Sequence, residues 1–206
     1  MYPYVQVVVL KTTPADASLV VLTNVLLEAN TTGGSPGNGG AVHITGNGDI
    51  QINGSWVIQN QADAEGGGLW NGTGTMTVLG TTIDANIASG DMSDQGGAGI
   101  FNAGGTIEIS TSTISNNTCD GSGGQGAGIH NDASGTISIE LSTISGNNSD
   151  TNGGGIANNG TLTIETSTIT ENTASGNGGG IIQLLAANSV NLNSTILAGN
   201  NSNSTG

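Results

Sequence analysis

The sequence predicts an all-β protein, a parallel β-helix with three strands in each coil and about seven coils. Three observations predict this fold. A glycine-rich unit recurs along most of the chain, short alternating aliphatic patches recur inside each unit, and 37 of the 206 residues are glycine while only 2% are aromatic. A repeated unit that cannot bury its own apolar face is stable only when it stacks on its neighbours. The composition fits a narrow coil that holds aliphatic side chains inside and glycine at tight corners.

The length of the unit is set by the aliphatic residue that follows each glycine run. This residue recurs at intervals of 25 to 31 positions, at Val42, Leu69, Ile100, Ile129, Ile156 and Ile181. Residues 153–172 show the complete unit most clearly. Three short strands and three turns of this combined length describe one coil of a β-helix.

Each unit is expected to contain three strands whose side chains alternate between the inside and the outside of the coil. The first strand begins at the aliphatic residue after the glycines. The second holds two aliphatic residues two positions apart, as at Ile137 and Ile139, and the third lies five residues beyond. The inward residues expected on the third strand are Val57, Ile83, Ile114, Ile144, Ile169 and Leu197.

An asparagine follows each third strand at the same distance. An amide at a turn can bond to the equivalent amide of the next coil, so we predict a structural asparagine ladder rather than a ligand site. The residues of this ladder are Asn30, Asn60, Asn86, Asn117, Asn147, Asn172 and Asn200.

Taken in order, the chain is expected to form one solenoid domain over residues 1–206. Residues 1–38 supply an N-terminal strand, expected at positions 4–10, and the first coil. Residues 39–200 supply the regular coils, and residues 201–206 form a polar tail. No sequence pattern of a capping helix is visible at either end, although solenoids usually cover their terminal coils.

The unit resembles the glycine-rich right-handed β-helix repeat of bacterial surface proteins, namely polymorphic outer-membrane proteins and autotransporter-like passengers. The residues that carry the resemblance are Gly154-Gly155-Ile156-Ala157-Asn158 and the segment from Leu162 to Ile169. It covers roughly residues 39–200. The resemblance implies a right-handed coil and an exported protein with an adhesive or structural role.

The charge balance limits the classes of partner. One Lys or Arg stands against 15 Asp and Glu, which gives a net charge of −14. Nothing can neutralise phosphates, so the sequence argues against nucleic acid and against anionic membranes as partners. No apolar stretch is long enough for a membrane span. We expect an extracellular or cell-surface protein whose single cysteine, Cys119, is a free thiol in a loop, with an intermolecular disulfide as the alternative.

The sequence shows no catalytic motif, so we expect no enzyme activity and no cofactor. Glycosidases of this fold need paired carboxylates, and the outward positions of the second strands carry only a sparse acidic stripe. For calcium, the best local pair of ligands is Asp91 and Asp94.

Two ligand-binding alternatives depend on outward side chains. Trp70, Phe101 and His130 occur one coil apart and could stack on the sugar rings of surface glycans. The Thr113/Ser115, Thr143/Ser145 and Thr168/Thr170 pairs resemble the hydroxyl ladders of ice-binding β-helices, although threonine is also simply a good strand residue. A polysaccharide-active β-helix is a further alternative.

Outward apolar residues gather in the coils near both ends, and exposed apolar patches usually mark contact surfaces. We therefore predict head-to-tail self-association into a filament or surface appendage. The alternative is a piece of an adhesin passenger that binds host or glycan surfaces. The residues predicted for self-association are Tyr4, Val5, Val7, Val9, Leu26, Trp56, Ile58, Ile182, Leu184, Leu185 and Ile196.

Overall fold

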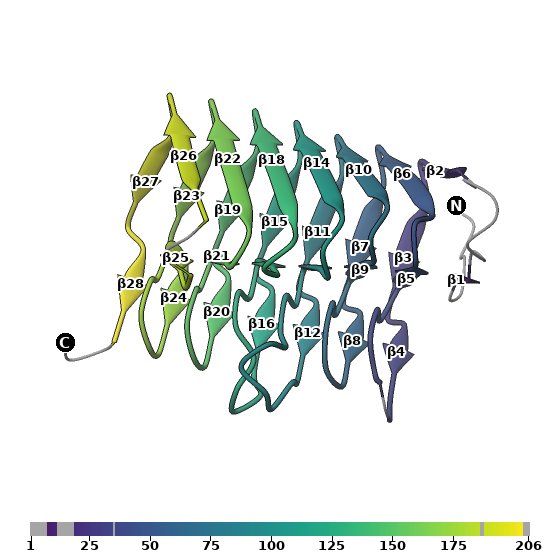
Figure 1. Cartoon of the computed structure of the whole chain (residues 1–206), viewed down its shortest axis with the longest axis horizontal. Helices are drawn as coiled ribbons and strands as arrows, with labels where there is room; N and C mark the ends of the chain where they lie inside the picture. The colour runs from purple at the N-terminus through teal and green to yellow at the C-terminus, as the bar shows by residue number, and fades with distance from the viewer. Residues whose placement is uncertain (1–7, 12–18, 35, 186–187, 204–206) are drawn as a thin grey trace.

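The computed structural model describes residues 8–11, 19–34, 36–185 and 188–203, and every regular element in them is a β-strand. The strands stack into a rod in which β1–β4 lie at one end and β25–β28 at the other (Figure 1). Each of four parallel sheets runs along the rod and contains seven strands, which corresponds to about six turns. The predicted all-β parallel solenoid is therefore confirmed. Its right hand stays an expectation from the resemblance.

The first two sheets contain the strands that follow the glycine runs and the strands with the aliphatic pairs. The first sheet consists of β1 (Val8–Lys11), β5 (Val42–Thr45), β9 (Leu69–Asn71), β13 (Ile100–Asn102), β17 (Ile129–Asn131), β21 (Ile156–Asn158) and β25 (Ile181–Gln183). The second sheet consists of β2 (Leu19–Thr23), β6 (Asp49–Asn53), β10 (Thr75–Leu79), β14 (Thr106–Ser110), β18 (Thr136–Glu140), β22 (Thr161–Glu165) and β26 (Val190–Asn193).

The other two sheets lie on either side of the asparagine ladder. The third sheet consists of β3 (Leu26–Glu28), β7 (Trp56–Ile58), β11 (Thr82–Asp84), β15 (Thr113–Ser115), β19 (Thr143–Ser145), β23 (Thr168–Thr170) and β27 (Ile196–Ala198). The fourth consists of β4 (Thr31–Thr32), β8 (Gln61–Ala62), β12 (Ile87–Ala88), β16 (Thr118–Cys119), β20 (Asn148–Ser149), β24 (Thr173–Ala174) and β28 (Asn201–Ser202).

The fourth sheet corrects the prediction of three strands per coil. Its strands have only two residues each, too few for an alternating pattern to be visible in the sequence. Two further predictions change with it. Residues 201–202 form β28 and belong to the last coil rather than to a polar tail, and Cys119 is a buried strand residue rather than a loop thiol.

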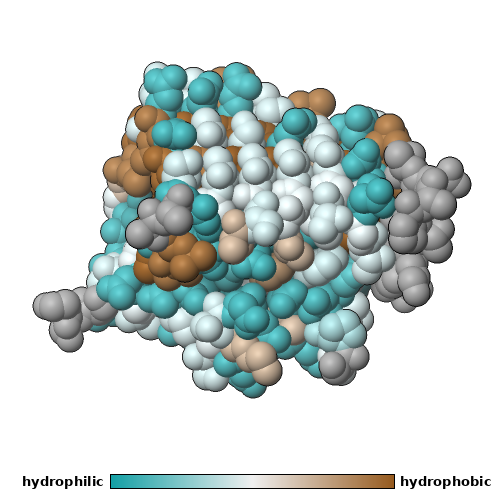
Figure 2. All heavy atoms as spheres, in the orientation of Figure 1, coloured by the Kyte–Doolittle hydropathy of each residue, from teal (hydrophilic) through white to brown (hydrophobic). Residues whose placement is uncertain are grey.

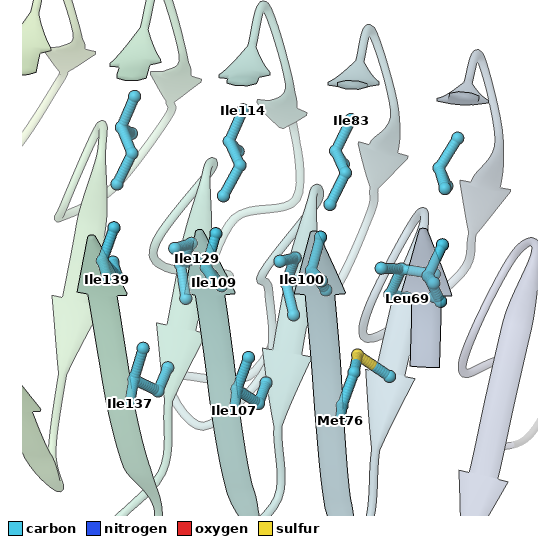
Figure 3. Close-up of a cluster of buried hydrophobic side chains, with 14 of the residues drawn as sticks. Leu69, Met76, Ile83, Ile100, Ile107, Ile109, Ile114, Ile129, Ile137 and Ile139 are labelled. Carbon is cyan, nitrogen blue, oxygen red and sulfur yellow. The ribbon is translucent and has the colours of Figure 1, made fainter. Parts of the chain in front are cut away.

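The core runs along the axis of the rod and consists of inward aliphatic columns. Figure 3 shows the middle coils, where Ile107, Ile109 and Ile114 point into the space between sheets. In the second sheet Met76 pairs with Ile107 and Ile107 with Ile137, so like side chains lie one above another. Each buried aliphatic side chain contributes about 1.5–3 kcal/mol, which stabilises coils that no helix covers.

Two corners of every coil use a left-handed residue. The corner after the second sheet has positive φ at Asn24, Gly54, Gly80, Thr111, Leu141, Thr166 and Ser194. The corner after the third sheet has it at Ala29, Gln59, Ala85, Asn116, Gly146, Glu171 and Gly199. Most of these residues are not glycine, so their backbones are strained, and this strain lowers the stability of the fold.

A third corner, in the loop before the first sheet, admits glycine alone. At Gly66 φ is 62°, and a Cβ atom there would lie 2.5 Å from the Leu69 carbonyl oxygen. The same backbone turn recurs at Gly97, Gly126 and Gly153. This steric requirement explains why the glycine run is the most regular part of the repeat.

Candidate functional site: the open last coil

The last coil, formed by β25–β28, exposes two core positions that are buried throughout the middle coils. Leu192 and Leu197 occupy the inward columns of the second and third sheets, yet each is 46% exposed. Their partners in the preceding coil, Ile164 and Ile169, are fully buried. The difference arises because, in the described part of the chain, no strand pairs with β26 or β27 on their outer side. We call β25–β28 the open coil.

Outward apolar side chains surround the open coil. Ile196 is 59% exposed and Leu185 is exposed, while Ile182 and Leu184 are half-buried. Figure 2 shows the largest areas of apolar surface at the end of the molecule where these strands lie. The middle coils present mainly threonine, serine and acidic side chains outward, and Leu79, Met92 and Leu141 are their exposed apolar residues.

The opposite end is also apolar, but it is less open. Leu19 and Val21 of β2 are 55% and 52% exposed, whereas Val20 and Leu22 are half-buried against the core. Leu27 of β3 is fully buried, although it occupies the same column as the half-exposed Leu197. The two ends of the rod therefore differ, and the open coil exposes more of the core.

The structure places the residues predicted for self-association at both ends. Leu26 pairs with Trp56 across β3 and β7, and Trp56 is exposed. Val9 belongs to β1, which pairs with β5, and Tyr4, Val5 and Val7 lie outside the described residues. Leu192 and Leu197 are not among the predicted residues, because the prediction rests on outward positions only. The inward pattern of the final unit was the signal that could have identified them.

The predicted asparagine ladder is present as a column of buried amides. Asn117 Oδ1 accepts hydrogen bonds from the backbone N and from Nδ2 of Asn86, each at 2.9 Å. Asn117 in turn donates from N and Nδ2 to Asn147 Oδ1, and its Nδ2 also donates to the Ile83 carbonyl. The same pattern runs from Asn30 to Asn200, so every coil is bonded to the next through the interior. We call this the asparagine column.

Two more polar columns were not predicted. A second amide column consists of Asn71, Asn102, Asn131, Asn158 and Gln183, each donating from its side-chain amide to the next residue. A hydroxyl column consists of Ser55, Thr81, Ser112, Ser142 and Ser167. From Thr81 onward, each hydroxyl accepts a hydrogen bond from the backbone N of the column member one coil before it. Three interior corners of the coil are thus satisfied by side chains.

The expected aromatic stripe exists, but it is not a surface for sugars. His43, Trp70, Phe101 and His130 stack in order, with ring centroids 4.2, 6.4 and 4.9 Å apart. Phe101 and His130 are buried, and only Trp70 and His43 keep partial exposure. The prediction that Trp70, Phe101 and His130 present a glycan-stacking face is therefore wrong for Phe101 and His130. The Nδ1 atom of His130 lies 3.4 Å from the carbonyl oxygen of Gln125, in the loop before its strand.

Two titratable groups at the stack, Glu65 and His130, have shifted pKa values. Trp70 Nε1 and Asn38 Nδ2 both donate to Glu65 Oε2, at 2.8 and 2.9 Å. Burial raises the pKa of Glu65, against the lowering effect of the Trp70 bond, and Asp94 and Asp132 add to the rise. Burial also lowers the pKa of His130, whose Nε2 has no hydrogen-bond partner in the described residues.

The acidic loops link neighbouring coils. Asp91 Oδ1 accepts from the backbone N and Oγ of Ser122, and Asp120 Oδ1 accepts from Ser89 Oγ. Asp91 and Asp94 are both exposed. Within the described residues no group of three or more His, Cys, Asp or Glu side chains is arranged to hold a metal ion. Calcium binding at Asp91 and Asp94 stays a prediction.

The outer face of the second sheet carries two shallow grooves of about 240 Å³ each. Glu108 and Glu140 line one groove, and Asp49 lines the other. Asp49 Oδ1 accepts from the Thr75 backbone N, so this carboxylate also serves the fold.

Cys119 lies in the fourth sheet, and its side chain is buried in the core. It packs with Ala88, Ala98 and Ala127, and burial raises the pKa of its thiol to about 12. An intermolecular disulfide through Cys119 is therefore wrong, because its sulfur is neither accessible nor ionised at neutral pH.

Comparison with known proteins gives no relative, since no protein-family model, no curated protein and no solved structure matches the chain. Within its described residues the chain has no helix that is long and apolar enough to cross a membrane.

Proposed function

We propose that this protein is a non-enzymatic structural subunit of the cell exterior that stacks head to tail into a filament or surface appendage. The observation that carries the proposal is the open coil, where Leu192 and Leu197 of the core columns are half exposed. A second copy that places its first coil on this end would bury them.

The register of the sheets supports a second copy as the occupant. All strand pairs are parallel, and each inward column keeps the same position from coil to coil. A first coil stacked in this register would set Leu22 on Leu192 and Leu27 on Leu197. Outside the third sheet it would join Ile196 to Leu26, which is already paired with Trp56. The outward apolar residues of both ends would then form one continuous column.

The symmetry of such a contact favours a fibre. The two surfaces come from opposite ends of the rod, so each subunit contributes its open coil to one junction and its first coil to the next. A heterologous contact that translates along an axis does not close on itself and gives a filament. The open strand edges would be paired at every junction except the two fibre ends.

The energetics favour assembly at high protein concentration. Complete burial of an exposed Leu or Ile contributes about 1.5–3 kcal/mol, so half-exposed Leu192, Leu197 and Ile196 contribute about 1 kcal/mol each. Leu27 is already buried in the single chain, so its column gains less from stacking, and association itself costs free energy. We therefore expect a concentration-dependent equilibrium.

The exterior location is proposed from charge and from the resemblance to bacterial surface-protein repeats. A chain with net charge −14 and one basic residue is suited to solubility and repels nucleic acid and anionic lipid. The second candidate is a stretch of an adhesin passenger, and the open coil supports it as well, because a further coil of the same chain would cover Leu192 and Leu197 equally.

The experiment is negative-stain microscopy with sedimentation velocity over a range of protein concentrations. We expect rods much longer than one subunit for the wild type, and their loss in Leu197→Asp and Leu192→Asp. The matched control is Leu141→Asp, which places the same charge at a 53% exposed leucine in the middle of the rod. Strictly monomeric wild type at high concentration contradicts stacking and favours the adhesin passenger.

A further inference from the structure

We propose that the turn at Asn47 and Gly48 is a self-modification site, at which the chain converts Asn47 into isoaspartate and aspartate without an enzyme. The turn joins β5 to β6, and Asn47 is exposed. The inference does not rest on the proposed stacking. It follows from the way the coils hold most Asn–Gly pairs of the chain in hydrogen bonds and leave this pair open.

Asn–Gly pairs are the starting point of the inference. Asparagine is a chemically labile residue, and a following glycine makes it more reactive, because no Cβ atom keeps the glycine nitrogen away from the asparagine side chain. The reaction also needs a backbone N–H that no hydrogen bond holds in place. The chain contains seven such pairs, which begin at Asn38, Asn47, Asn53, Asn71, Asn152, Asn159 and Asn177.

Four of these pairs are protected, because the glycine N–H donates to a carbonyl of a neighbouring coil. Gly54 N, for example, donates to the Leu79 carbonyl at 2.9 Å. A fixed N–H cannot turn toward the asparagine side chain unless the coil opens locally. The glycines with such a bond are Gly39, Gly54, Gly72 and Gly153.

Two further pairs have no such bond among the described residues, but neighbouring coils hold their asparagines. Asn177 donates from its backbone N to Asn152 Oδ1 at 2.9 Å. Asn159 donates from its backbone N to the Asn131 carbonyl at 2.8 Å, and Gly160 is buried. The backbone of both asparagines is therefore fixed.

The pair at Asn47 meets every requirement of the reaction. Asn47 is exposed, and in the described part of the chain neither its side chain nor the Gly48 N–H has a hydrogen-bond partner. The bonds that fix the turn lie outside the pair, since Thr75 N donates to Asp49 Oδ1 at 2.8 Å. The turn is thus anchored beside the reacting atoms and open at them.

The reaction needs only the chain and water. The nitrogen of Gly48 attacks Cγ of Asn47, and a bond forms between these two atoms. The Cγ–Nδ2 bond breaks, and ammonia leaves with the proton of the attacking nitrogen. Water then opens the succinimide ring at one of its two carbonyls. One opening gives aspartate, and the other gives isoaspartate, in which a side-chain carbon has become part of the backbone.

Isoaspartate would lengthen a turn that the next coil holds at two points. The Gly46 carbonyl accepts from Thr73 N at 2.7 Å, before the reacting pair, and Asp49 accepts from Thr75 N after it. An added backbone carbon changes the separation of these two anchors, so we expect one of them to be lost. Modification would also place a new carboxylate close to Asp49.

The test is peptide mapping by mass spectrometry after incubation of the folded chain at mildly alkaline pH, with an isoaspartyl methyltransferase applied to the peptides. We expect isoaspartate to form about tenfold faster, or more, at Asn47 than at Asn53, the matched Asn–Gly pair whose glycine N–H is bonded. In denaturant, where no N–H is held, the two rates should be similar. Equal rates in the folded chain, or no isoaspartate at Asn47, would overturn the proposal.

Two variants test the consequence for the turn. Asn47→Gln should stop the reaction at this position and keep its stability during incubation. Asn47→Asp carries the new charge without the longer backbone. We expect the incubated wild type to unfold at a lower denaturant concentration than Asn47→Asp, whereas equal midpoints would contradict the loss of an anchor.

Discussion

At the scale of single residues, the interior amides bear much of the fold's specificity. Each internal asparagine of the column serves three coils, because it accepts from one neighbour, donates to the next and bonds a carbonyl of the preceding coil. Removing one partner from a buried network costs more than the bond itself is worth.

We therefore expect Asn117→Ala to lower the free energy of unfolding by about 3–5 kcal/mol. The side chain of Asn86 and the Ile83 carbonyl would lose their partner inside the rod. Chemical denaturation measures the change. The control, Asn148→Ala, alters an exposed asparagine of β20 and should stay within about 0.5 kcal/mol. Equal losses in the two variants would contradict the role of the column.

A second residue-scale prediction concerns pH. Burial lowers the pKa of His130 below its unfolded value of 6.5, so the unfolded chain binds a proton that the folded chain refuses. The stability from neutral His130 is present above pH 6.5 and is lost as the pH falls below it, by at most about 1.4 kcal/mol per unit.

His130→Phe removes this titration and keeps the stack on Phe101, whose ring centroid is 4.9 Å from that of His130. We expect the variant to lose less stability than the wild type between pH 7 and pH 5, as measured by denaturation at each pH. His43→Phe is the matched control, since His43 is only half-buried and should change the pH profile less. Parallel profiles for wild type and His130→Phe would contradict the prediction.

At the scale of elements, the corners and the columns depend on each other. A left-handed residue precedes every member of the asparagine column, as Asn116 precedes Asn117, and every member of the hydroxyl column, as Leu141 precedes Ser142. The turn sends the next side chain inward, where its hydrogen bonds offset the strain. These two columns therefore stabilise the turns as well as the stacking.

The strain at one corner can be measured. Leu141 has φ of 49° and is 53% exposed, so Leu141→Gly removes strain and little apolar contact. We expect a gain of about 1 kcal/mol in the free energy of unfolding. Leu79→Gly is the control, because Leu79 is similarly exposed but lies within β10, where glycine should destabilise by about 0.5–1 kcal/mol. A loss in both variants would show that the corner is not strained.

At the scale of the whole molecule, the rod is regular through its middle coils, and its core positions are half exposed in the open coil. The middle coils satisfy their own strand edges, core and polar columns. In the open coil, the strands of Leu192 and Leu197 pair on one side only among the described strands. Both proposed functions cover this surface with another coil, either of a second copy or of the same chain.

The sequence by itself determined the parallel solenoid and three of its four sheets. The alternation of aliphatic residues gave the inward face of the second and third sheets, and the fixed spacing of Asn30 to Asn200 gave the asparagine column. Both follow from local geometry, because a strand alternates with a period of two and equal units stack in equal register. The glycine runs followed from a backbone corner that has no room for a Cβ atom.

Only the tertiary structure decided what is covered and what is open. The sequence placed Phe101 and His130 on the outer side of their strands, yet both are buried in the folded chain. It placed Leu192 and Leu197 on the inside, and the lack of a further strand in the described residues exposes them. The two-residue strands that bury Cys119 were too short to show a pattern. Periodicity fixes the face on which a side chain lies, but burial depends on neighbours from distant parts of the chain.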